Sequence, residues 1–200
     1  LAKGQALKLA RNAMIDIVSC MVAGGTDVAT RRTLDAVRDL GDGPASIVGN
    51  TEMLTAPHAA LVNGTAAHAL DFDDNYHGNM GHATAVLAPA LLALGEERGC
   101  DGRAVLDAYI AGLEAMLVIG KGVSLAHYEK GWHTTSTIGT IGAAAAAAPV
   151  ERPTRTAGTP PSRAMGASPY PRPGPRRGGP RPPPGIASAR GGPRAQRPAR

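Results

Sequence analysis

Apolar side chains recur at helical spacing through most of the first 148 positions. In the opening stretch, intervals of three or four residues separate Leu7, Ala10, Met14, Ile17 and Met21. This period predicts an amphipathic helix. The pair Gly24-Gly25 that follows gives the helix a natural end.

Five further helices are predicted from the same period and from residues typical of helix ends. Asp27 and Asp101 are placed to cap the second and fifth helices. Pro57 suits the first turn of the third helix, which we expect to run through His68. Gly41 and Gly99 follow the second and fourth helices, where a residue without a side chain is favoured.

The sixth helix, Ile138 to Ala148, is apolar all round, which predicts a central buried helix. Residues Ala45 to Gly49 form at most a short extended piece, and no strand-like alternation is present elsewhere. The expected fold class is therefore all-α, with one helical domain over residues 1–148.

Composition divides the chain at that boundary. Residues 1–148 carry 10 Lys and Arg against 15 Asp and Glu, whereas residues 149–200 carry 11 Arg, one acid and 14 of the 17 prolines. This second part cannot build a core, so we predict a disordered basic tail. The change in composition is abrupt. Translation of GC-rich DNA in the wrong reading frame gives a sequence rich in Pro, Arg, Gly and Ala, so we expect a truncation or frameshift after about residue 148.

A genuine tail would have another use. It could bind nucleic acid or an acidic partner through charge, which makes a non-catalytic helical domain with a basic arm the alternative function. Its one aromatic residue, Tyr170, does not favour nucleic acid, because base stacking needs more rings.

Two cysteines 80 residues apart, Cys20 and Cys100, fit a reducing compartment and supply too few thiolates for an iron–sulfur cluster. No leader-like or membrane-spanning run is found, so we predict a cytoplasmic protein without membrane association. Leu1 in place of Met suggests a fragment or a non-standard start codon.

One loop concentrates ionisable groups between the third and fourth helices. It holds Asp71, Asp73, Asp74 and His82. Three carboxylates within four residues repel one another and are typical of functional sites, although aspartates that cap helices on a solvated loop explain them equally well. Metal binding is a rival explanation, but the sequence has no HExxH, no Glu-x-x-His and no adjacent His-Asp pair, so we predict no metal. His58 and His68 are expected to be core or surface histidines.

A second candidate segment surrounds His133, just before the sixth helix. The N-terminus of a helix attracts anions, so a substrate carboxylate could lie beside His133 and the hydroxyls of Thr134, Thr135 and Ser136. Alternatively, one hydroxyl only caps the helix while Trp132 fills the core.

Both segments, NGTAAHALDFDDNYHGNMGHAT and AHYEKGWHTTSTIGTIGAAAAA, resemble the signature stretches of the MmgE/PrpD family, and a weaker likeness extends from Ala6 to Ala148. The family includes 2-methylcitrate dehydratase and cis-aconitate decarboxylase. The resemblance implies a carbon–oxygen lyase that acts on small polycarboxylates without a metal or organic cofactor. It also implies a helical domain with an α+β lid and a homodimer when intact. Neither the lid nor the family's later lysine segment has a counterpart here, so we expect impaired activity.

The resemblance also assigns residues. Asp71, His82 and His133 match the family's catalytic positions, and Asn75, Thr134 and Thr135 are expected to bind substrate. Asn75 stands where the decarboxylase-type motif has threonine, and Ala83 where proline is usual. A histidine with an ordinary pKa of about 6.5 suits proton abstraction beside a carboxylate at neutral pH. We therefore assign His82 as the acid/base, Asp71 as its partner and His133 as the carboxylate- or enolate-binding group.

Overall fold

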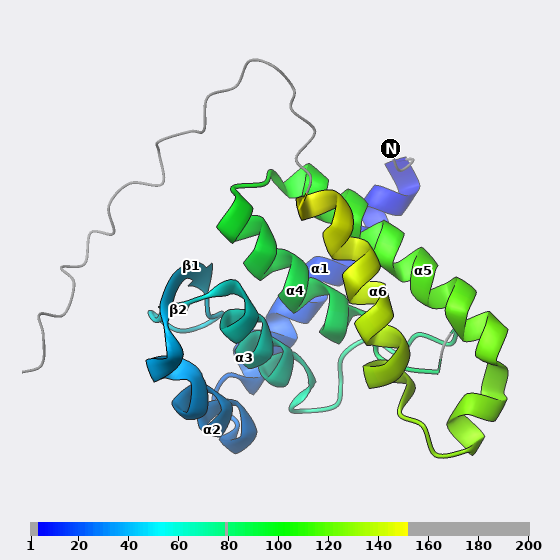
Figure 1. Cartoon of the computed structure of the whole chain (residues 1–200), viewed down its shortest axis with the longest axis horizontal. Coiled ribbons are helices and arrows are strands. Elements are labelled where there is room, and N and C mark those ends of the chain that lie inside the picture. The colour runs from blue at the N-terminus through cyan, green and yellow to red at the C-terminus, as the bar shows by residue number, and fades with distance from the viewer. Residues whose placement is uncertain (1–3, 79, 152–200) are drawn as a thin grey trace, which may run out of the picture. The chain divides into compact units, whose positions relative to one another are not determined.

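The computed structural model describes residues 4–78 and 80–151 (Figure 1). From position 152 onward the predicted tail lies outside the described residues. The predictions that it is disordered, that it acts as a basic arm and that it is read out of frame therefore fall outside the structure.

The described part is mostly helical, which confirms the predicted fold class. Its helices are α1 (Gly4–Gly24), α2 (Val28–Val37), the short 3-10 helix η1 (Arg38–Leu40), α3 (Ala56–His68), α4 (Ala83–Arg98), α5 (Gly102–Glu129) and α6 (Thr134–Glu151). Two short strands, β1 (Asp42–Ser46) and β2 (Met53–Leu54), pair in an antiparallel manner close to the predicted extended piece.

Local signals at the helix ends are confirmed. The carboxylate of Asp27 accepts a hydrogen bond from the Ala29 amide at 2.7 Å, and that of Asp101 accepts one from the Ala104 amide at 2.8 Å. Gly99 follows α4 in the left-handed conformation, with φ of 64°. The two aspartates accept hydrogen bonds from amides that the first turn of a helix leaves unpaired. Gly99 lets the chain leave α4 in a conformation that a residue with a side chain rarely adopts.

α4 packs against α1, α3, α5 and α6 (Figure 1). Leu87 and Leu91 of α4 are fully buried with Met116 of α5 and Ile138 of α6. Burial of each large apolar side chain contributes about 1.5–3 kcal/mol before the entropy of ordering is subtracted. This core fixes α4 and α6, which begin directly after His82 and His133.

The prediction that α6 is buried all round is wrong. One face, with Ile138, Gly142 and Ala146, packs on α4 and α5, but Ile141 on the other face is 54% exposed. An alanine-rich composition alone does not say how many neighbours surround a helix. Among the described residues, α6 has neighbours on one side.

Within the described part, no single helix is long and apolar enough to cross a membrane. Among these residues, α1 and Val28–Leu40 reach the length and apolar composition of a membrane span only when they are taken together, and the chain bends by 87° between them.

Candidate active site

The loop between α3 and α4 folds back on itself. Asp71 adopts a positive φ of 53°, a conformation that costs energy for a residue with a side chain. Further along, Tyr76 and Gly81 exchange backbone hydrogen bonds of 2.8 and 3.4 Å, which closes the turn between them. The two features return the chain so that His82, the residue before α4, lies beside the start of the loop.

The N-terminus of α6 holds this loop in place. The Thr135 hydroxyl accepts a hydrogen bond from the His82 amide at 3.0 Å, and the Thr134 hydroxyl donates one to the Met80 carbonyl. Both threonines are buried. Gly81 lies against them so closely that a Cβ there would be 2.9 Å from the Thr135 hydroxyl. These threonines therefore support the loop, and their role in substrate binding stays a prediction.

Four side chains converge where the loop returns. Asp73 lies between two imidazoles, with Oδ1 at 2.8 Å from His68 Nδ1 and Oδ2 at 3.2 Å from His82 Nδ1. Nε2 of His82 faces Asp71 Oδ1 at 3.7 Å. The rings of His68 and His82 are 4.6 Å apart. The side chain of Asp73 is completely buried, whereas that of Asp71 is 78% exposed.

This arrangement corrects the expectation for His68. His68 is neither a plain core histidine nor a plain surface one, because it pairs with Asp73. An adjacent His-Asp pair is missing from the sequence, yet the fold creates one from residues five positions apart. An ionised carboxylate can only accept hydrogen bonds, so Nδ1 of His68 donates to Asp73. The four ionisable groups, each offering one atom, lie within 4.8 Å of one another and could hold a metal ion.

Asp74 has a different task from its neighbours. Its carboxylate accepts hydrogen bonds from the Thr84 amide at 3.1 Å and from the Thr84 hydroxyl at 2.6 Å. That hydroxyl also meets the Tyr109 hydroxyl of α5 at 2.6 Å. Burial raises the pKa of Tyr109. The helix-capping interpretation therefore holds for Asp74, while Asp73 caps nothing.

A pocket of about 510 Å³ adjoins this cluster and is formed by α3, α4 and the start of α6. Most of its lining is apolar, and its polar side chains include those of His68, His133, Thr135 and Ser136. A mostly apolar hollow with a few converging polar groups is typical of a ligand site. Asp71 and His82 do not line the pocket. The ring of His82 lies 4.6 Å from the ring of His68, which does line it.

The structure brings His133 to this pocket, directly before the first residue of α6. It is exposed, and its Nδ1 lies 3.3 Å from the Ser136 hydroxyl. Trp132 does not fill the core, because its side chain is 58% exposed and stacks on His127 with ring centroids 5.8 Å apart. Asn75 is exposed and is not among the pocket's lining residues.

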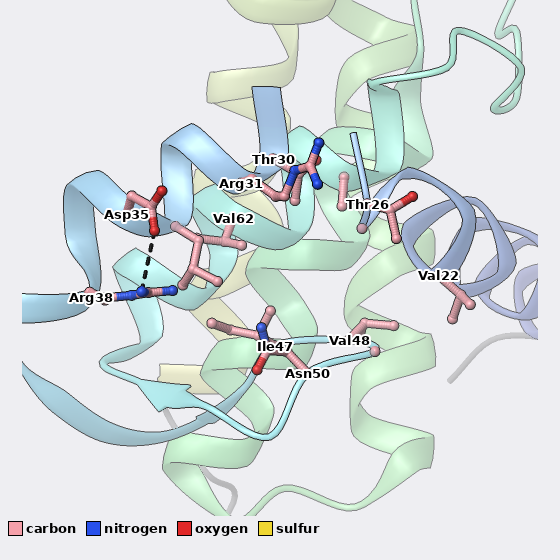
Figure 2. Close-up of a pocket in the computed structure, with 14 residues that line it drawn as sticks. Val22, Thr26, Thr30, Arg31, Asp35, Arg38, Ile47, Val48, Asn50 and Val62 are labelled. Carbon is pink, nitrogen blue, oxygen red and sulfur yellow. Dashed lines mark ion pairs between the residues drawn. The ribbon is translucent and has the colours of Figure 1, made fainter. Parts of the chain in front are cut away.

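A second pocket, of about 350 Å³, lies between α2 and the turn at residues 47–50 (Figure 2). Figure 2 shows the ion pair of Asp35 in α2 and Arg38 in η1 on one side, with Ile47, Val48 and Asn50 on the other. The two charged groups are 3.3 Å apart. It shares no lining residue with the first pocket and contains no histidine or cysteine. Acid/base chemistry is therefore better supported at the first pocket.

Known proteins resemble this chain over the same region. A cis-aconitate decarboxylase-like protein, oryM, of Aspergillus oryzae is 27% identical over 149 residues, which cover 70% of this chain and 31% of that protein. Human cis-aconitate decarboxylase is 31% identical over 115 residues, or 52% of this chain and 22% of the human protein. The mouse protein of that name is 33% identical over 105 residues, or 47% of this chain and 20% of the mouse protein.

The chain thus aligns with less than a third of the length of these curated relatives. Residues 2–157 also match the model of the MmgE/PrpD N-terminal domain, a stretch that contains both signature segments and every residue of the cluster. This match covers well over half of the sequence and agrees with the resemblance found in the residues themselves. The chain therefore belongs to the MmgE/PrpD family.

Proposed function

We propose that this domain carries the acid/base half of a lyase that acts on small polycarboxylates, with His82 taking a proton from the carbon beside a carboxylate. The observation that carries the proposal is the pairing of His82 with two carboxylates, the buried Asp73 at Nδ1 and the exposed Asp71 at Nε2. The names of the relatives, cis-aconitate decarboxylases, support the same class of substrate.

The two carboxylates have separate roles in this proposal. Asp73 cannot move to solvent, so it fixes the ring of His82 and stabilises the positive charge that forms when the ring takes a proton. Asp71 is exposed and shares the transferred proton at Nε2. An imidazole has one nitrogen that can accept a proton and can later return it, which suits this role.

His133 completes the proposed site by binding a substrate carboxylate. It stands at the N-terminus of α6, where unpaired amides and the helix dipole favour an anion. The same donors would stabilise the enolate that forms as the proton leaves. Thr134 and Thr135 would act through the loop that they hold, and the exposed amide of Asn75 would reach substrate from the loop itself.

Two outcomes can follow proton abstraction. In a dehydratase of the 2-methylcitrate type, a carbon–oxygen bond breaks, and the β-hydroxyl leaves as water after it gains a proton. In a decarboxylase, the abstracted proton returns to another carbon of the substrate, a carbon–carbon bond breaks to release carbon dioxide, and a second proton, taken from solvent, replaces the lost carboxylate on carbon. We assign the first class to this chain and test both, because the relatives carry the name of the second.

The test incubates the full chain with 2-methylcitrate, citrate and cis-aconitate in turn and follows the products by proton NMR. We expect turnover of at least one acid, its loss in His82→Ala and its retention in His77→Ala, since His77 is exposed in the same loop but outside the cluster. Binding of tricarballylate, an analogue that has no hydroxyl group to lose, is measured in parallel. Turnover unchanged in His82→Ala, or no binding of any of these acids, would refute the proposal.

A further inference from the structure

We propose that His68, Asp71, Asp73 and His82 form a binding site for one divalent transition metal ion, for which Zn²⁺ is the best match. The sequence predicted no metal, because it contains none of the usual metal motifs. The fold instead assembles the donors from the end of α3 and the loop that follows it. The binding itself does not depend on the proposed lyase activity.

The spacing of the donor atoms suits a single small ion. Tetrahedral zinc binds nitrogen and oxygen at about 2.0–2.2 Å, which places neighbouring donor atoms about 3.3–3.6 Å apart. Nδ1 of His82 lies 3.2 Å from Oδ2 of Asp73, and Nδ1 of His68 lies 2.8 Å from the other oxygen of the same carboxylate. All four residues offer one donor atom within 4.8 Å of the others, so one ion can bind them after small side-chain rotations.

Two buried atoms in the cluster lack a hydrogen-bond partner. Within the described part of the chain, Asp73 Oδ2 and His82 Nδ1 have almost no exposed surface and make no hydrogen bond, although they face each other. Buried polar atoms are almost always satisfied, so two buried atoms that lie 3.2 Å apart without a hydrogen bond between them call for an explanation. An ion bound between them would satisfy both atoms at once.

The donor set selects the type of ion. Two imidazoles with two carboxylates favour Zn²⁺ or a similar transition metal, because Mg²⁺ and Ca²⁺ prefer six or more oxygen ligands. The ion would replace the ring proton that His68 donates to Asp73. Asp71, which is exposed, would supply the fourth ligand or leave that position to water. A metal-bound His82 cannot take a proton, so zinc would inhibit the proposed reaction.

The full chain can be used for the test, because residues 152–200 contain no His, Cys, Asp or Glu. Zn²⁺ binding is measured by isothermal titration without substrate, and Co²⁺ serves as a spectroscopic probe, since tetrahedral cobalt absorbs visible light much more strongly than hydrated cobalt. We expect one ion per chain. Asp73→Asn, His68→Gln and His82→Gln should each weaken binding at least about tenfold.

Matched controls are His77→Gln, in the same loop, and Cys100→Ser, which removes the more accessible thiol. Both should bind as the unchanged chain does. Circular dichroism checks that each variant is folded. Should the cluster variants unfold, imidazole nitrogen NMR of the unchanged chain decides: zinc should shift the ring nitrogens of His68 and His82 and leave those of His58 unaltered.

Three results would overturn the site: no saturable binding, binding unaffected by Asp73→Asn and His82→Gln, or zinc-induced shifts at histidines outside the cluster alone. Since no substrate is present, these outcomes are independent of whether the chain is a lyase. Zinc binding without turnover would leave the metal site standing and refute only the proposed reaction.

Discussion

Thr84→Val tests how the fold anchors the candidate site. The Thr84 side chain is 1% exposed, and valine has nearly its shape but no hydroxyl. The hydroxyl donates to Asp74 at 2.6 Å, and such a hydrogen bond to a charged group is worth about 1.5–3 kcal/mol. Valine also leaves the buried Tyr109 hydroxyl without its partner, at a cost of about 1 kcal/mol or more.

The two effects together predict a loss of about 2–4 kcal/mol in the free energy of unfolding. Urea unfolding should be followed by far-ultraviolet circular dichroism, because the fold is mostly helical and Trp132 is too exposed to report on the core. Thr140→Val is the matched control, since the Thr140 hydroxyl, among residues 4–78 and 80–151, bonds only to the Ser136 carbonyl on an exposed face. If both variants lose the same small amount, the Asp74–Thr84–Tyr109 network does not anchor the loop.

Further predictions concern pH, thiol chemistry and packing. Burial raises the pKa of Tyr109 in the folded state above its ordinary value of about 10, so its contribution to stability is present below that pH and is lost as pH rises above it; Tyr109→Phe should reduce the alkaline loss measured by urea unfolding, and an unchanged profile would contradict this. Burial also raises the pKa of the Cys20 thiol, so a thiol reagent should modify Cys100 well before Cys20, and equal rates would be inconsistent with the fold. Gly24→Ala would place a Cβ 2.0 Å from the Ala66 carbonyl oxygen and should lower the free energy of unfolding by about 1–3 kcal/mol. Gly122→Ala, with nothing within 4 Å, should raise it slightly. A thermal midpoint for Gly24→Ala no lower than that of Gly122→Ala would contradict the close contact of α1 with α3.

Sequence reasoning succeeded where the cause is local. Asp27, Asp101 and Gly99 act on the backbone within a few residues, so their effects could be read from the chain. The loop could also be singled out from the chain alone, because three carboxylates in four positions are visible without a fold, and its catalytic role stays a prediction.

The remaining features depend on contacts that sequence spacing does not reveal. His68 meets Asp73 only because Asp71 has a positive φ and the loop turns back. The bond from the His82 amide to Thr135 spans 53 positions, so nothing near either residue predicts it. One signal was available in retrospect: a histidine at the last position of a helix, followed by acids three and five positions later.

The most direct test of the central claim, that His82 takes a proton beside a carboxylate, is deuterium exchange into tricarballylate in D₂O. This measurement reports proton abstraction itself and does not require a complete turnover. Proton NMR should show loss of the signals beside the carboxylates with the unchanged chain and with His77→Gln, and no loss above the buffer rate with His82→Gln. Exchange at an equal rate in all three proteins, or in none, would contradict the assignment of His82 as the base.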